Sequence, residues 1–184
     1  MAVELGELLA GYAPRTAAEA ADLRRVRLLL TTAEDPWSRT QPLHVTASAV
    51  IVHPPTRQVL LRWHHRQQAW LHVGGHGDPG ETVPLDIARR EAVEESALDD
   101  VTPWPDAALV HLAIVSVPAA PGGPAHEHAD LRFALATADP EAARPENAAA
   151  ALRWVPFAEA RDATTSTSLR ETLTRLAPWL GTLP

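Results

Sequence analysis

The sequence predicts an α/β fold in which helices cover both faces of a mixed sheet, preceded by N-terminal helices. Short runs rich in Val, Leu, Ile, Trp or Thr, bounded by Pro, Gly or charged residues, alternate with helical patterns along the chain. Some runs are joined by short hairpin turns and others by a helix, which together favour a mixed sheet. The chain has 184 residues, enough for a sizeable core, and we expect a single domain over 1–184.

The first forty residues, 1–40, are interpreted as a helical extension. We expect helices over 3–11 and 16–32, with Thr16 as the N-cap residue before an Ala- and Leu-rich segment. The run Leu28-Leu29-Leu30 is interpreted as ordinary core. The extension either caps the sheet or forms the contact of a homodimer.

The sheet and the remaining helices follow the extension. Candidate strands lie at 46–53, 58–63, 70–73, 109–117, 131–137 and 151–155. Candidate helices lie at 84–96, 156–160 and 166–179, and loops are expected over 118–124 and 139–147.

Composition and charge exclude several classes of protein. The chain has no cysteine, which excludes disulfides, thiolate zinc sites and cysteine nucleophiles. Its formal net charge of −7 argues against a surface that coats nucleic acid. No apolar run approaches about 18 residues and no signal peptide is indicated, so we expect a cytoplasmic protein without a membrane span. All 16 basic residues are arginine, so any phosphate clamp is a planar guanidinium.

The segment richest in chemical information is a Gly-rich turn, 75–81, followed by an acidic helix that carries Arg90. Glu91, Glu94 and Glu95 sit at i, i+3 and i+4 and therefore share one face of that helix. Carboxylates crowded in this way repel one another unless a cation lies among them. Mg²⁺ prefers oxygen clusters of this kind and brings substrate phosphates with it.

These residues resemble the Nudix box, G-x5-E-x7-R-E-U-x-E-E-x-G-U, in which U is a bulky aliphatic residue. The box spans 75–98, and the matching positions are Gly75, Glu81, Arg90, Glu91, Glu94, Glu95 and Leu98. Eight residues rather than seven separate Glu81 from Arg90, which we interpret as a longer loop that leaves the acids in place. Ala92 replaces the first U, and Ala97 replaces the final Gly. A left-handed residue is usual there and Ala costs roughly 1 kcal/mol, so we expect the helix to end differently.

The resemblance to Nudix hydrolases implies an α/β/α sandwich and chemistry at a diphosphate. It implies that the Gly75 carbonyl, Glu91, Glu94 and Glu95 hold Mg²⁺ or Mn²⁺. Arg90 belongs to the catalytic residues together with these acids. It would form a supporting ion pair with Glu81. Glu91 or Glu94 would orient or deprotonate the attacking water.

The resemblance covers about residues 40–160. Segments 44–49, 70–76 and 126–133 are similar to a branch of the family with Gly-Gly-His at the entry to the box and without a secure substrate. The resemblance therefore indicates the chemistry and leaves the substrate open among nucleoside triphosphates, ADP-ribose, dinucleoside polyphosphates and nucleotide sugars.

Several residues outside the acidic helix are candidate substrate ligands. His76, inside the turn, either faces the substrate phosphates or caps the turn. Glu146, in a loop before a strand, either completes metal binding or serves as the base, as the resemblance implies for a distal acid, or is a solvated loop acid. Arg62, Arg66 and Arg132 are possible phosphate clamps, although a surface role is favoured for each. Tryptophans on the strands are interpreted as core rather than as base-stacking residues.

The segment 126–130 predicts a row of ligands. On a strand, residues two apart point to one face, so His126, His128 and Asp130 would form a single row. The row could bind a transition metal or contact substrate phosphates, and we interpret it as positioning the substrate. We predict that it lies at the rim of the pocket, near the acidic helix. The alternative is a loop of exposed histidines.

The sequence therefore predicts a metal-dependent pyrophosphohydrolase that cleaves a nucleoside diphosphate linked to another moiety, so its partner is a small nucleotide-type molecule. The alternative is a non-catalytic Nudix-fold module that binds a ligand or another protein. Such modules usually lose box acids, whereas all four are kept here. An isomerase of isoprenoid diphosphates, which has a related fold, resembles an enzyme that needs a cysteine, and the chain has none.

Overall fold

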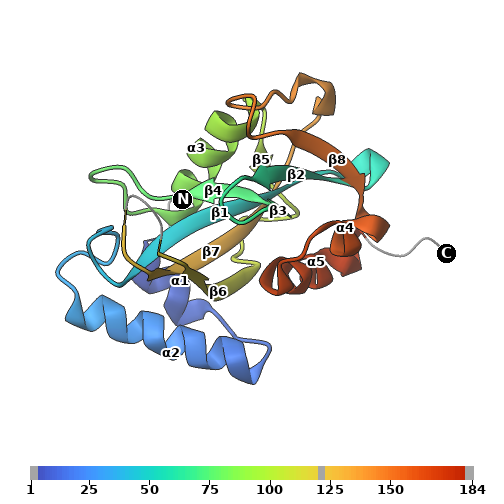
Figure 1. Ribbon diagram of the computed structural model, residues 1–184. Helices are drawn as coiled ribbons and strands as arrows, with labels where there is room; N and C mark the ends of the chain where they lie inside the picture. The colour runs from blue at the N-terminus through green and yellow to red at the C-terminus, as the bar shows by residue number, and fades with distance from the viewer. Residues whose placement is uncertain (1–3, 120–122, 181–184) are drawn as a thin grey trace.

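The protein is described by a computed structural model over residues 4–119 and 123–180. An eight-stranded mixed sheet has helices on both faces (Figure 1), which confirms the predicted α/β class and the N-terminal helices. The strands are β1 (Leu43–His53), β2 (Gln58–His64), β3 (Ala69–Leu71), β4 (Val73–Gly75), β5 (Thr102–Pro103), β6 (His111–Val117), β7 (His126–Ala136) and β8 (Leu152–Pro156). The helices are α1 (Leu5–Gly11), α2 (Ala17–Thr32), α3 (Pro84–Ser96), α4 (Phe157–Ala163) and α5 (Thr167–Leu180).

The two longest strands, β1 and β7, run parallel at the centre of the sheet, paired from Leu43↔Glu127 to Val52↔Ala136. Strands β6 and β5 pair antiparallel with the other side of β7. The other side of β1 is shared, since β4 pairs with its middle and β2 with its end. Strand β2 also carries β3 and β8. The sheet therefore splits beside β1, between β4 and β2.

Alternation along β1 assigns the two faces of the sheet. Its odd-numbered residues from Val45 to Ile51 pack in a core cluster with α1, α2 and the Ile87–Ala92 face of α3. Its even-numbered Val50 and Val52 pack in a second cluster with α4 and α5. Because successive side chains of a strand point to opposite faces, α3 and the last two helices cover different faces, as Figure 1 shows.

The strand boundaries depart from the prediction where side chains gave no apolar signal. The strand predicted over 70–73 is two short strands that separate at His72, because β3 pairs with β2 whereas β4 pairs with β1. Strand β7 begins at His126, well before the predicted start, because backbone pairing with β1 continues through its polar residues. Strand β5 was not predicted. The loop expected over 118–124 includes residues 120–122, which lie outside the described part of the chain.

The acidic helix α3 has the predicted bounds, but the expected change at its end was wrong. Ala97 takes the left-handed conformation of the missing glycine, with φ 57 and ψ 16, and its N–H donates to the Val93 carbonyl at 2.8 Å. The next residue, Leu98, is fully buried in the core cluster. Burial of a leucine is worth about 1.5–3 kcal/mol, which is more than the conformational strain at Ala97. The helix therefore ends as it would with the glycine of the box pattern.

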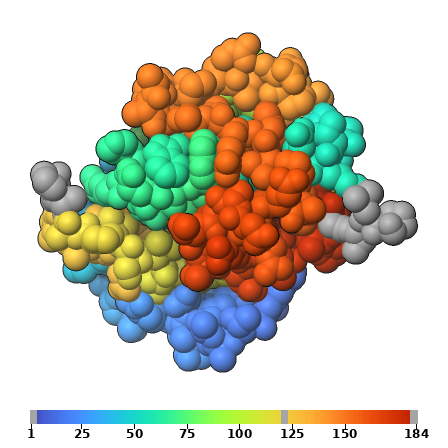
Figure 2. Space-filling model, turned by 45° about the vertical axis from the view of Figure 1, so that its right-hand side comes forward, coloured from blue at the N-terminus to red at the C-terminus, as the bar shows by residue number. Residues whose placement is uncertain are grey.

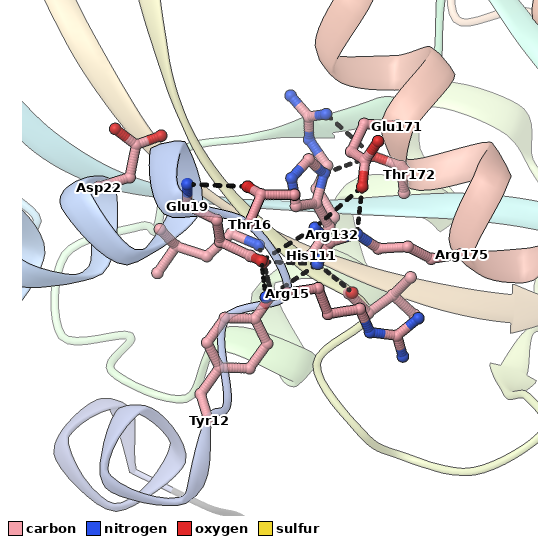
Figure 3. Close-up of polar contacts among 12 residues, drawn as sticks. Tyr12, Arg15, Thr16, Glu19, Asp22, His111, Arg132, Glu171, Thr172 and Arg175 are labelled. Atoms are coloured by element: carbon pink, nitrogen blue, oxygen red, sulfur yellow. Dashed lines mark hydrogen bonds and ion pairs between the residues drawn. The ribbon is translucent and has the colours of Figure 1, made fainter.

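The N-terminal extension covers the free edge of β6 through Tyr12 and Asp22, which are labelled in Figure 3. The Tyr12 hydroxyl accepts from Leu112 N–H at 3.1 Å, and the Asp22 carboxylate accepts from Ile114 N–H at 3.0 Å. These bonds satisfy backbone groups that an edge strand would otherwise expose. The extension therefore caps the sheet, which is one of the two roles that the sequence left open. Its Leu28, predicted to lie in the core, is 62% exposed.

The N-terminal extension lies below α5 in the view of Figure 2, and a buried ion pair joins the two. Arg175 donates to both oxygens of Glu19, at 2.5 and 2.9 Å, and the Tyr12 hydroxyl donates to the same carboxylate. Burial raises the pKa of Glu19, but its hydrogen-bond donors outweigh burial and hold the pKa at about 2. Thr16 caps α2 as predicted, accepting from Glu19 N–H at 3.1 Å. Among the described residues, no helix is long and apolar enough to cross a membrane.

Candidate active site

Helix α3 presents two of its acids against the backbone of β4. Gly74 N–H donates to the Glu95 carboxylate at 2.9 Å. A Cβ added at Gly75 would lie 2.7 Å from Oε1 of Glu91 and 2.8 Å from its Oε2. Only glycine therefore lets the strand lie this close to the carboxylate. The structure brings together Gly75, Glu91 and Glu95, as the resemblance implies.

Arg90 is the cation among these acids. Its guanidinium lies 2.8 Å from Glu81, 2.9 Å from Glu94 and 3.2 Å from Glu91, so the expected ion pair with Glu81 is present. It also donates to the His76 carbonyl at 2.8 Å. The hydrogen bonds from Arg90 lower the pKa of Glu81. Arg90 thus fixes the turn relative to the helix despite the longer loop between them.

Arg62 and Glu146 join the same cluster from outside the box. The Arg62 guanidinium on β2 lies 3.2 Å from Glu95 and 3.1 Å from Glu146. The surface role favoured for Arg62 is wrong, because its side chain is mostly buried beside these acids. The side chain of Glu146 is 52% exposed, so it is a distal acid at the rim of the acidic cluster.

The protonation of the buried acids follows from their surroundings. Burial raises the pKa of Glu95 to about 7, although Gly74 N–H and Arg62 favour its charged form. Burial also raises the pKa of Glu91. A buried carboxylate of this kind is stabilised by a proton or by a cation. The donor set consists entirely of oxygens, three carboxylates and a backbone carbonyl, which fits Mg²⁺ or Mn²⁺.

A cavity of about 1300 Å³ opens on the other face of the sheet, where α5 begins. Its lining includes His44, His76 and His128, together with the backbone of Gly74 and Gly75. The acids of α3 are not part of that lining. Gly74, Gly75 and His76 therefore connect the cavity to the acidic cluster, since the glycine backbone contacts the acids and the His76 carbonyl accepts from Arg90.

The predicted row of ligands exists, but its predicted position was wrong. His126 and His128 lie on β7 with their Nε2 atoms 3.1 Å apart, and Asp130 follows them in the cavity lining. The alternate residues Ala129 and Leu131 pack in the core cluster on the α3 side. The row consequently faces away from α3, on the opposite face of the sheet. The apolar residues between the polar ones decided which face the row takes.

The buried carboxylate of Asp130 is bonded to other side chains of the protein. Its carboxylate accepts from Ser48 at 2.6 Å, from Arg132 at 2.7 Å and lies 3.2 Å from His72 Nε2. Arg132 also donates to Thr172 on α5 at 3.0 Å and is buried, so the surface role favoured for it was wrong. Arg66 lines the cavity.

His76 and His128 in the cavity wall are neutral at neutral pH. Burial is the main cause that lowers the pKa of His76 to about 3 and that of His128 to about 4. His44 and His72 were not proposed as site residues from the sequence. The sequence signal for His44 was alternation, since it lies two residues from Thr46 on one strand. Its position opposite His128 is set by the pairing of β1 with β7.

Comparison with known proteins assigns the family. The family model described as the NUDIX domain matches residues 42–177. The chain therefore belongs to the NUDIX domain family, and the resemblance drawn from the acidic helix is confirmed. No curated protein matches the chain significantly.

Solved structures share the fold. The C. elegans Ap4A hydrolase is 18% identical with a TM-score of 0.55, over 74% of this chain and 97% of that chain. The E. coli dihydroneopterin triphosphate pyrophosphohydrolase is 21% identical with a TM-score of 0.51, over 76% and 95%. A NUDIX family hydrolase from Clostridium perfringens is 24% identical with a TM-score of 0.53, over 72% and 97%.

Proposed function

We propose that the protein is a metal-dependent pyrophosphohydrolase that cleaves a nucleoside diphosphate linked to another moiety. The observation that carries the proposal is the close packing of the Glu91 and Glu95 carboxylates on the backbone of Gly74–Gly75, with Arg90 as the cation among the acids. The names of two structural neighbours, an Ap4A hydrolase and a dihydroneopterin triphosphate pyrophosphohydrolase, support cleavage within a chain of phosphates.

In this proposal the Gly75 carbonyl, Glu91, Glu94 and Glu95 would hold Mg²⁺ or Mn²⁺. The ion would supply neutralisation of the charge that develops on the phosphate oxygens. Arg90 orients the acids through its bonds to Glu91 and Glu94.

Glu94 is the proposed acceptor of the proton from the attacking water. The side chain of Glu94 is 54% exposed, whereas that of Glu91 is 14% exposed, so water reaches Glu94 more readily. Glu146, held by Arg62 beside Glu95, is the proposed rim acid that contacts the substrate or its metal.

A phosphate-release screen over nucleotide diphosphate compounds, with and without Mg²⁺, tests the proposal. Glu94→Gln and Glu95→Gln should each lower turnover by orders of magnitude, because loss of a charged metal ligand costs several kcal/mol. Glu159→Gln, a change at an exposed acid of α4, is the matched control and should leave turnover unchanged. Wild-type turnover in both box variants would show that the assigned mechanism is wrong.

The same screen separates the alternative of a non-catalytic ligand-binding or interaction module. Such a module would bind members of the panel in calorimetry and release no phosphate. The homodimer, the cytoplasmic location and the single domain over 1–184 stay predictions from the sequence.

A further inference from the structure

Four histidines from distant parts of the sequence converge on the wall of the large cavity. His44 comes from β1, His76 follows β4, and His126 and His128 come from the start of β7. The Nε2 atoms of His44 and His76 are 3.0 Å apart, and those of His126 and His128 are 3.1 Å apart. One ring nitrogen from each of His44, His76 and His128 lies within 4.8 Å of the other two.

Backbone carbonyls fix the tautomers of two of these rings. His44 Nδ1 lies 2.9 Å from the Gln41 carbonyl, and His126 Nδ1 lies 2.9 Å from the Pro124 carbonyl. A carbonyl oxygen can only accept, so each Nδ1 carries the proton and each neutral ring keeps a lone pair on Nε2. Metal-binding histidines use the same arrangement, in which one nitrogen donates to a carbonyl and the other faces the ion.

The spacing of the nitrogens agrees with a shared ion. Two imidazole nitrogens that bind one tetrahedral Zn²⁺ at 2.0–2.1 Å lie about 3.3 Å apart. Among the three rings, His44 and His76 are within a few tenths of an ångström of that value. The His128 nitrogen lies within 4.8 Å of both, and its Nε2 is 3.1 Å from that of the neighbouring His126. A hydrogen bond would explain either pair alone, but it joins only two rings, whereas three rings converge here.

We propose that His44, His76 and His128 form a binding site for a divalent transition metal ion of the Zn²⁺ type. Imidazole suits zinc and its neighbours, whereas the all-oxygen cluster on α3 suits Mg²⁺ or Mn²⁺. The site lies on the face of the sheet opposite α3, so its ligands differ from the box acids and it does not depend on the proposed function. It adjoins the box through His76, which follows Gly75 and whose carbonyl accepts from Arg90. The absence of cysteine excludes thiolate zinc sites only.

The three ligands leave a coordination position toward the cavity. His126, next to His128, is placed to fill it or to border it. An ion with three neutral ligands keeps its double positive charge. Arg39 and Arg66 line the same cavity, so the site would attract an anionic group of a molecule bound there.

Metal titration of the whole chain tests the site. After chelator treatment and dialysis, Zn²⁺ is titrated by calorimetry in excess Mg²⁺, which occupies oxygen sites. The protein should bind one Zn²⁺. His76→Ala and His128→Ala should each weaken binding more than about 100-fold, since loss of even an outer-shell partner costs 10–100-fold. His65→Ala, at an exposed histidine outside the cluster, is the matched control.

A second measurement needs no variant. Co²⁺ held by three imidazoles in a four- or five-coordinate site gives visible absorption bands much stronger than those of Co²⁺ in an octahedral oxygen site. Strong bands are expected for the parent protein and their loss for His128→Ala. The proposal fails if the parent binds no Zn²⁺, if its Co²⁺ bands are weak, or if Glu95→Gln abolishes Zn²⁺ binding while the histidine variants keep it.

Discussion

Glu95→Gln tests the electrostatics of the acidic cluster directly. Burial raises the pKa of Glu95 from its ordinary value of 4.5 to about 7. The folded protein therefore binds this proton more tightly than the unfolded chain, and the stability that the group contributes is full below pH 4.5 and is lost as pH rises through 7. At about 1.4 kcal/mol for each pH unit between the two pKa values, the loss is roughly 3 kcal/mol. Glutamine never ionises and keeps an oxygen for Gly74 N–H, so it avoids this loss.

Urea denaturation in chelator-containing buffer at pH 5 and pH 8 measures the effect. Glu95→Gln should match the parent at pH 5 and exceed its free energy of unfolding at pH 8 by up to roughly 3 kcal/mol. Glu94→Gln, at an exposed position, should change the free energy by less than about 1 kcal/mol at either pH. Added Mg²⁺ should stabilise the parent and not Glu95→Gln. A Glu95→Gln protein no more stable than the parent at pH 8 would refute the burial argument.

Three further changes test packing. Ala97→Gly should raise the free energy of unfolding in urea by about 1 kcal/mol, since glycine adopts the left-handed conformation without strain, and an unchanged value would contradict that conformation. Gly75→Ala should lower turnover at least tenfold with little change in melting temperature, because its Cβ displaces the Glu91 carboxylate, and full activity would contradict the close packing. Arg175→Met should destabilise the protein by about 3–5 kcal/mol, since it leaves Glu19 charged and buried. The added change Glu19→Gln should recover much of this loss in the same urea measurement, and no recovery would mean that the cost comes from packing.

The sequence by itself determined the features that depend on neighbours along the chain. The bounds of α3 and the shared face of Glu91, Glu94 and Glu95 follow from helical periodicity, which needs no distant contact. Thr16 as a helix cap is equally local. The mixed sheet followed from the order of strands and helices, because apolar runs and turn residues punctuate the chain.

Only the tertiary structure decided which distant residues meet. Alternation showed that His126 and His128 share a face, but the face itself was set by the packing of Ala129 and Leu131 on the α3 side. The approach of Arg62 to the acidic cluster depends on the split of the sheet between β2 and β4, which strand order alone does not specify. The convergence of histidines likewise requires the parallel register of β1 and β7, which is set by long-range packing rather than by any local pattern.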